Sequence, residues 1–139
     1  MLALRRRTMS TALLTLAIGW TITGCSTSES GDAAYVGTWN ATSFTSGGME
    51  HIAQGMTFTF TFSNSGQYAF TITNDQAGLC DLASDCSDSG TFTATDTQIV
   101  LDAGMPDATT LQYGISGNTM RIDALIDDIT IVVFMDRRV

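Results

Sequence analysis

The chain of 139 residues contains no lysine, one histidine and one proline. No stretch shows a convincing apolar period of about 3.6 residues, which argues against a helical domain. Pro106 falls between apolar runs, where its missing amide is harmless to a sheet. Because His51 is the only imidazole and no nucleophile-elbow or His-Glu metal motif is present, we expect a protein that is not an enzyme and carries no cofactor.

Residues 1–24 have the pattern of a secretory signal peptide. Arg5, Arg6 and Arg7 form a basic start, and residues 11–20 are apolar but too few to span a membrane comfortably. The following Ile22-Thr23-Gly24-Cys25 resembles the lipobox of bacterial lipoproteins. This resemblance implies cleavage before Cys25, a diacylglycerol thioether on its sulfur and acylation of the new amino terminus. The alternative is an ordinary signal with an incidental cysteine.

Residues 25–34 are expected to be the lipidated cysteine and a small, polar, flexible tether. Two or more acyl chains make a stable membrane anchor. Ser26 stands where an aspartate would resemble the inner-membrane retention signal of Gram-negative lipoproteins, so the expected location is the outer membrane of such a bacterium. Residues 35–139 are then one folded domain.

The expected mature chain is strongly acidic. It keeps three arginines, Arg121, Arg137 and Arg138, against 14 acidic residues, which gives a formal charge of −11. Such a surface repels nucleic acid, and we expect no nucleic-acid partner.

Cys80 and Cys86 remain as a pair once Cys25 is assigned to lipid. In an exported protein we expect them to form a disulfide, which in the chain-entropy model contributes about 2.4 kcal/mol. A zinc site built from these two thiols would lack histidine partners.

Strand patterns fill the rest of the chain. Residues 56–62 and 67–73 alternate aromatic or aliphatic residues with threonine and alanine across a short polar turn, as in a half-buried hairpin. Tight connections alternate with mostly longer ones, which favours an up-and-down meander that closes into a barrel and removes its edges. The eight expected strands are 35–44, 56–62, 67–73, 90–94, 98–101, 109–115, 119–125 and 129–135.

A family resemblance supports this fold. Gly37-Thr38-Trp39 matches the Gly-x-Trp signature of lipocalins, and segments 90–101 and 111–122 resemble the hairpins of short bacterial lipocalin-like lipoproteins. The resemblance implies an all-β, eight-stranded, antiparallel up-and-down barrel. It also implies that Arg137, or failing that Arg138, packs across Trp39 at a closed end beside Gly37.

The meander places the longer connections together at an open end. That end is expected to be an acidic mouth, which would disfavour carboxylate ligands and favour neutral or cationic ones; the alternative is a solvated rim. We expect His51 to be a surface residue there. The residues assigned to this end are Glu50, His51, Asp75, Asp81, Asp85, Asp88, Asp102, Asp107, Asp127 and Asp128.

Alternation assigns a set of large apolar side chains to the interior. An eight-stranded barrel is either filled by such side chains or left with room for one small ligand, and the many aromatic residues favour filling. If a cavity exists, the expected lining residues are Phe58, Phe60, Tyr68, Phe70, Ile72, Phe92, Tyr113, Met120 and Ile131.

Two functions follow as hypotheses. The first is a membrane-anchored lipocalin-like lipoprotein that binds or shields a small apolar or weakly cationic molecule. The second is a packed barrel without an internal ligand that acts as a protein-interaction module, such as an envelope assembly factor or a hydrolase inhibitor. Asp81, Asp85 and Asp88 are a weak candidate for a calcium site, since their spacing does not fit an EF-hand.

Overall fold

The computed structural model describes residues 32–139; the expected signal peptide, Cys25 and most of the expected tether lie outside these residues. No helix within residues 32–139 has the length and apolar character needed to cross a membrane. The elements are β1 (Gly37–Ser46), β2 (Met49–Glu50), η1 (Ile52–Gln54), β3 (Thr57–Phe62), β4 (Gln67–Thr73), β5 (Cys86–Ala94), β6 (Gln98–Leu101), β7 (Thr109–Ser116), β8 (Thr119–Ile126) and β9 (Ile129–Arg137).

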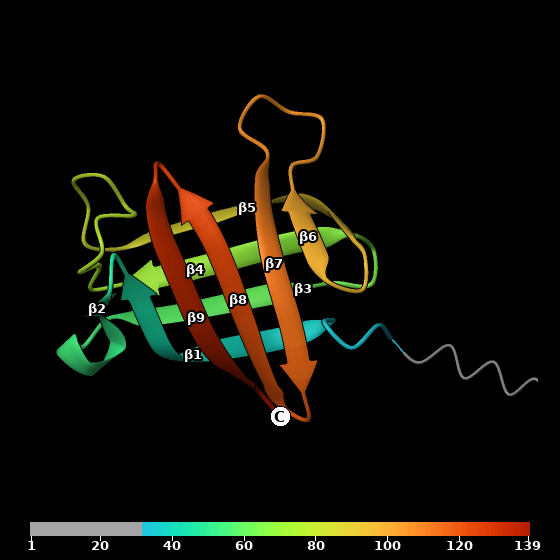
Figure 1. Ribbon diagram of the computed structural model, residues 1–139, viewed down its shortest axis with the longest axis horizontal. Coiled ribbons are helices and arrows are strands. Elements are labelled where there is room, and N and C mark those ends of the chain that lie inside the picture. Colours follow the sequence, from blue (N-terminus) through green and yellow to red (C-terminus); the bar gives the residue numbers. More distant parts are fainter. Residues whose placement is uncertain (1–31) are drawn as a thin grey trace, which may run out of the picture.

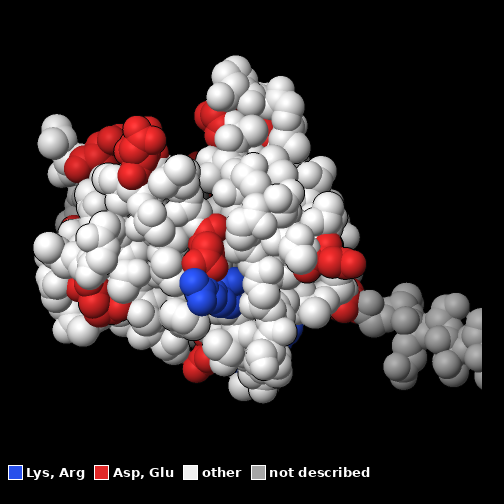
Figure 2. Space-filling view, viewed as in Figure 1, with Lys and Arg blue, Asp and Glu red and all other residues white. Residues whose placement is uncertain are grey.

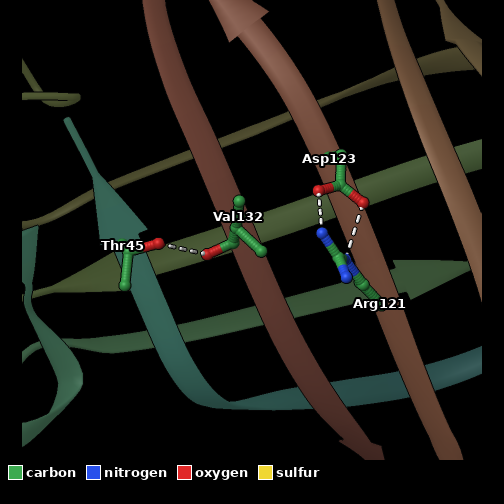
Figure 3. Close-up of polar contacts among 4 residues, drawn as sticks. All are labelled: Thr45, Arg121, Asp123 and Val132. Atoms are coloured by element: carbon green, nitrogen blue, oxygen red, sulfur yellow. Dashed lines mark hydrogen bonds and ion pairs between the residues drawn. The ribbon is translucent and has the colours of Figure 1, made fainter. Parts of the chain in front are cut away.

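The sheet closes on itself (Figure 1). From β3 to β9 each strand pairs antiparallel with the next, β1 pairs with β3, and β1 also pairs with β9. Besides the ladder, the hydroxyl of Thr45 in β1 donates to the carbonyl of Val132 in β9 at 3.3 Å (Figure 3). The predicted eight-stranded antiparallel barrel is therefore confirmed, and β2 is a two-residue addition to the end of β1.

Two regions differ from the sequence expectation. β2 and the short 3₁₀ helix η1 lie in a segment expected to be a loop. β5 begins at Cys86, four residues before the expected start, because the polar residues 86–89 pair with β4 through backbone groups that do not depend on side-chain polarity.

The strand β3 shows how the pattern specifies the wall of the barrel. Phe58, Phe60 and Phe62 are buried, while the intervening threonines lie on the outer side. Phe62 is only 1% exposed, and burying a side chain of this size contributes roughly 1.5–3 kcal/mol. A shift by one residue would expose all three rings, so the burial fixes the register of β3.

Trp39 and Arg137 pack together at the closed end. Trp39 is fully buried and its indole N–H donates to the carbonyl of Tyr35 at 2.8 Å. The guanidinium carbon of Arg137 lies 4.3 Å from the centre of the Trp39 ring, and its Nη1 donates to the carbonyl of Val36 at 2.6 Å. A side chain at Gly37 would come within 2.7 Å of that Nη1, so the glycine makes room for the arginine.

The chain enters the barrel at this closed end. The amide of Asn64, in the tight turn between β3 and β4, donates to Asp32 at 3.2 Å. The longer connections before β3, β5 and β7 and the short β8–β9 turn gather at the opposite end (Figure 1). The open end of the barrel therefore faces away from the first described residue.

Arg137→Ala should destabilise the fold. The change removes the contact with Trp39 and charge-assisted hydrogen bonds to backbone carbonyls, so we expect a loss of about 2–3 kcal/mol in the free energy of unfolding, measured by urea denaturation. Arg138→Ala is the control, because Arg138 is exposed. Equal losses of stability in the two variants would show that the stacking of Arg137 on Trp39 does not contribute to the free energy of unfolding.

Candidate ligand cavity

A cavity of about 300 Å³ occupies the half of the barrel nearest the open end. Most of its wall is aromatic or aliphatic, and its polar lining residues come from β5, from the β6–β7 connection and from the start of β7. The apolar lining residues are Phe44, Phe58, Phe60, Tyr68, Phe70, Ile72, Leu79, Leu101, Leu111, Ile122, Ala124, Ile126, Ile131 and Val133. The polar ones are Asp88, Asp102, Asp107 and Thr109.

Of the nine residues expected to line a cavity, the structure places Phe58, Phe60, Tyr68, Phe70, Ile72 and Ile131 on its wall. It does not place Phe92, Tyr113 or Met120 there. Phe92 packs edge-on against Phe62, Tyr113 directs its hydroxyl to the carbonyl of Thr95, and Met120 is completely buried. These three side chains point inward, but they belong to the packed half of the barrel.

The expectation of a filled barrel holds for one half only. Around Tyr35, edge-on contacts with Phe62, Phe92 and Tyr113 fill the closed half with interlocked rings. Near the open end, the inward positions of β8 and β9 carry smaller residues, among them Ala124 and Val133. Eight strands fix the circumference, so smaller side chains at this level leave space that nothing else fills.

Tyr68 and Asp102 form a fixed polar pair on the cavity wall. The Tyr68 hydroxyl donates to Asp102 Oδ2 at 2.6 Å, and the amide of Thr91 donates to Oδ1 at 3.2 Å. Gly90 lies beneath them, where a Cβ would come within 2.2 Å of Asp102 Oδ1 and 2.9 Å of the Tyr68 ring. Asp102 also has a positive φ of 49°, in the left-handed region that aspartate and asparagine adopt more readily than other residues with a side chain.

Asp88 is a carboxylate on the inner side of a strand. It pairs with Phe70 of β4, and Gly90 and Phe92 follow it at alternate positions on β5. Asp88 lines the cavity together with Asp107 from the β6–β7 connection. The sequence assigned these carboxylates to the open end; alternation would have placed Asp88 inside if the strand had been predicted to begin at Cys86.

The pKa of Tyr68 is raised well above its ordinary value. Burial is the largest cause, followed by the hydrogen bond to Asp102 and by the negative charges of Asp102, Asp88 and Asp107. These three carboxylates therefore act on the same hydroxyl. The pKa of Tyr113 is also raised, by burial and by the neighbouring Tyr35 and Asp96.

His51 is buried, which corrects its expected position on the surface. It is 3% exposed, Nε2 lies 2.9 Å from the Ser46 hydroxyl, and Nδ1 has no hydrogen-bond partner among the described residues. Its ring packs edge-on against Phe44, which lines the cavity. His51 therefore supports the cavity wall from behind and does not reach the cavity.

Glu50 orders the same connection. Its carboxylate accepts hydrogen bonds from the Ser43 hydroxyl at 2.6 Å and from the amides of Phe44 and Ile52 at 3.2 and 2.9 Å. Burial acts to raise the pKa of Glu50, but these hydrogen bonds together lower it. Glu50, which the sequence assigned to the mouth, thus holds η1 in place through these hydrogen bonds.

The predicted disulfide between Cys80 and Cys86 is confirmed, with Cα atoms 5.5 Å apart. It ties the β4–β5 connection to the start of β5. Within that connection, Asp75 accepts from the amide of Cys80 at 2.7 Å and Asp85 accepts from the amide of Asn74 at 2.8 Å.

The weak calcium candidate gains no support from the geometry. Asp85 serves the loop backbone, Asp81 is exposed and Asp88 lines the cavity. Within residues 32–139, no three or more acidic, histidine or cysteine side chains lie together in a way that would hold a metal ion.

The barrel, its closed end and its cavity agree with one family comparison. The model of a family described as a lipocalin-like domain matches residues 36–122, more than half of the chain. The chain belongs to the lipocalin-like domain family. No curated protein and no solved structure matches it. The matched region of this lipocalin-like domain runs from just before β1 into β8 and carries most of the cavity-lining residues.

Gly90→Ala should destabilise the lipocalin-like barrel by about 1–3 kcal/mol, because its Cβ would press Asp102 away from Tyr68. Gly114→Ala is the matched control: Gly114 lies in β7 with no neighbour within 4 Å of an added Cβ. We expect that control to be neutral or slightly stabilising by thermal denaturation, since alanine is less costly than glycine in a strand. Equal behaviour of the two variants would contradict the tight packing at Gly90.

The raised pKa of Tyr68 predicts a loss of stability in alkali. The folded-state pKa lies above the unfolded value of about 10. The contribution of Tyr68 to the free energy of unfolding is therefore fully present below about pH 10 and is lost progressively as the pH rises above it. Tyr68→Phe should reduce the slope by about 1.4 kcal/mol per pH unit in this range. Urea denaturation between about pH 8 and 11.5 measures the pH dependence of the free energy of unfolding in the parent and in the variant. Equal slopes in the two proteins would contradict the raised pKa of Tyr68. Tyr113 contributes to the slope in both.

Proposed function

We propose that this lipocalin-like domain belongs to a lipoprotein, anchored through Cys25 in the outer membrane of a Gram-negative bacterium, that binds or shields a small apolar or weakly cationic molecule. The observation that carries the proposal is the cavity of about 300 Å³, which is open at one end of a barrel whose other end is packed. It acts by binding and is not an enzyme. In support, the single imidazole of the chain, His51, is not among the residues that line the cavity.

The size of the cavity suits a small organic molecule. An apolar cavity of about 150 Å³ holds benzene, so one of twice that volume has room for roughly two rings or an eight-carbon chain. The wall consists largely of phenylalanine, leucine, isoleucine and valine side chains, so displacing water from it by an apolar part of a guest favours binding, whether or not the guest also has a polar group.

The charge of the cavity limits the class of guest. Three carboxylates and no basic residue are among its lining residues, so a fatty-acid carboxylate would meet repulsion at the mouth. On the face shown in Figure 2, acidic side chains lie on the loops of the open end and basic groups are few. Neutral and cationic molecules meet no such barrier.

The entry of the chain at the closed end supports the anchored arrangement. A tether leading from Cys25 reaches Asp32 beside the β3–β4 turn, at the opposite end from the cavity mouth. In the proposed arrangement the anchor attaches at the closed end, so the cavity mouth is the end of the barrel farther from the attachment and accessible to a guest from the aqueous phase.

A second candidate function is the protein-interaction module. It is favoured by exposed apolar side chains on the connections and strand ends near the open end, since exposed apolar patches are a recognised feature of docking surfaces. These residues are Met49, Leu79, Leu82, Met105, Leu125 and Ile129. The two functions differ in what they require of the interior, since the module needs no internal guest.

Uptake of N-phenyl-1-naphthylamine, a neutral apolar dye whose fluorescence rises in apolar surroundings, tests the proposed function. We expect saturable binding by the purified domain, weakened about tenfold by Ala124→Phe, because the added ring occupies the cavity. Leu125→Phe is the control, since Leu125 is 66% exposed on the same strand.

The thermal melting of both variants must match the parent for the comparison to hold. No saturable uptake by the parent protein, or equal uptake by Ala124→Phe, would overturn the proposal and transfer the function to the exposed loops.

A further inference from the structure

We propose that the natural guest is an amphiphilic monocation, with an apolar chain or ring in the cavity and an ammonium group held at its mouth by Asp88, Asp102 and Asp107. This inference rests on the proposed function, because it assigns a chemical class to the guest of the same cavity. It goes beyond that function in requiring the positive charge, which the apolar wall alone does not require.

Three carboxylates border the mouth of the cavity: Asp102 is half-buried, and Asp88 and Asp107 are exposed. Each of them is among the residues that enclose the same 300 Å³ space as Phe60 and Ile131. Their charges also act together in raising the pKa of Tyr68, whose hydroxyl contacts Asp102 directly at 2.6 Å. An apolar space with negative charge at one side is complementary to a molecule with a cationic end.

No protein cation neutralises these carboxylates among residues 32–139. The one ion pair there joins Arg121 to Asp123 at 2.7 Å on the outer side of β8 (Figure 3). Arg137 is held over Trp39 at the closed end, and Arg138 follows it there, with its backbone amide bonded to Thr38. The counter-charge at the mouth therefore has to come from the guest or from solvent ions.

The carboxylate of Asp102 is held in a fixed position. Gly90 leaves room for it beside Tyr68, since an added Cβ would come within 2.2 Å of Oδ1. The hydrogen bonds from Tyr68 and Thr91 occupy one lone pair on each carboxylate oxygen, so each oxygen keeps a further acceptor site. A fixed carboxylate with free acceptor sites binds an ammonium group without losing further side-chain freedom.

A metal ion does not fit this site as well as an organic cation. The three carboxylates line the cavity from separate places, and they do not form a group of ligands close enough for one ion within the described part of the chain. An ammonium group on an apolar body, by contrast, needs only one or two of them at a time. Tyr68 and Phe70, whose ring centres lie 6.5 Å apart on the cavity wall, are aromatic groups of the kind that attract a cation.

Calorimetry with octylammonium, 1-octanol and octanoate at neutral pH tests the proposal, because these probes share one chain and differ in charge. We expect octylammonium to bind about tenfold more tightly than octanol, and octanoate to bind more weakly than octanol. Ethylammonium, which lacks the chain, should show no saturable binding.

Asp88→Asn should reduce octylammonium affinity about fivefold to tenfold and leave octanol affinity unchanged. The matched control is Asp81→Asn, which removes the same charge from an exposed position outside the cavity lining. Asp88 suits this test because the one hydrogen bond recorded for its side chain is from the adjacent amide of Ser89, which asparagine can also accept.

Equal affinity for octylammonium and octanol would overturn the inference while leaving the proposed function standing. Equal effects of the Asp88 and Asp81 variants, or comparable binding of ethylammonium, would overturn it as well, since they would indicate ordinary surface ion pairing. If no octyl compound binds, the proposed function and the inference both fail.

Discussion

The pairing of β1 with β9 is the constraint on which the rest of this structure depends. Seven residue pairs join the first strand to the last, with one irregularity between Ala41 and Ser43. Closure removes both edges of the sheet and fixes the circumference at eight strands. The volume available inside is then nearly constant along the barrel, and the size of the inward side chains at each level decides whether that level is solid or hollow. Aromatic residues around Tyr35 fill the closed half, and smaller inward residues of β8 and β9, among them Ala124 and Val133, line the hollow half.

The polar groups of the cavity follow from the same constraint. A carboxylate directed toward a low-dielectric space is costly unless hydrogen bonds or water stabilise its charge. Asp102 receives two hydrogen bonds, and the wall provides for it by placing a glycine opposite. These hydrogen bonds have a structural return, since they tie the start of the β6–β7 connection to β4 and β5. Gly90 is required by this packing, because an added Cβ would meet both Asp102 and Tyr68.

The sequence predicted the architecture well, since strand alternation and connection lengths depend on local chemistry. The hairpin of β3 and β4 and the disulfide were specified by neighbouring residues, and so were predictable. The division of the interior was not, because Phe92 and Phe60 have the same local pattern and differ only in their height along the barrel. His51 was misplaced because its burial depends on the fold of β2 and η1 around it, and a two-residue strand leaves almost no periodic signal.

The acidic mouth and the proposed lipid anchor lie at opposite ends of the barrel, so the length of the strands sets the distance between them. Strands of eight residues that tilt by about 40° separate the two ends by roughly 20 Å, since each residue advances about 3.3 Å along a strand. This separation exceeds two Debye lengths at physiological ionic strength, which are about 16 Å together. The mouth carboxylates are thus screened from charges at the closed end, the end at which the proposed lipid anchor would attach. Their field therefore acts mainly on molecules that approach the open cavity, where Asp88, Asp102 and Asp107 border an apolar wall.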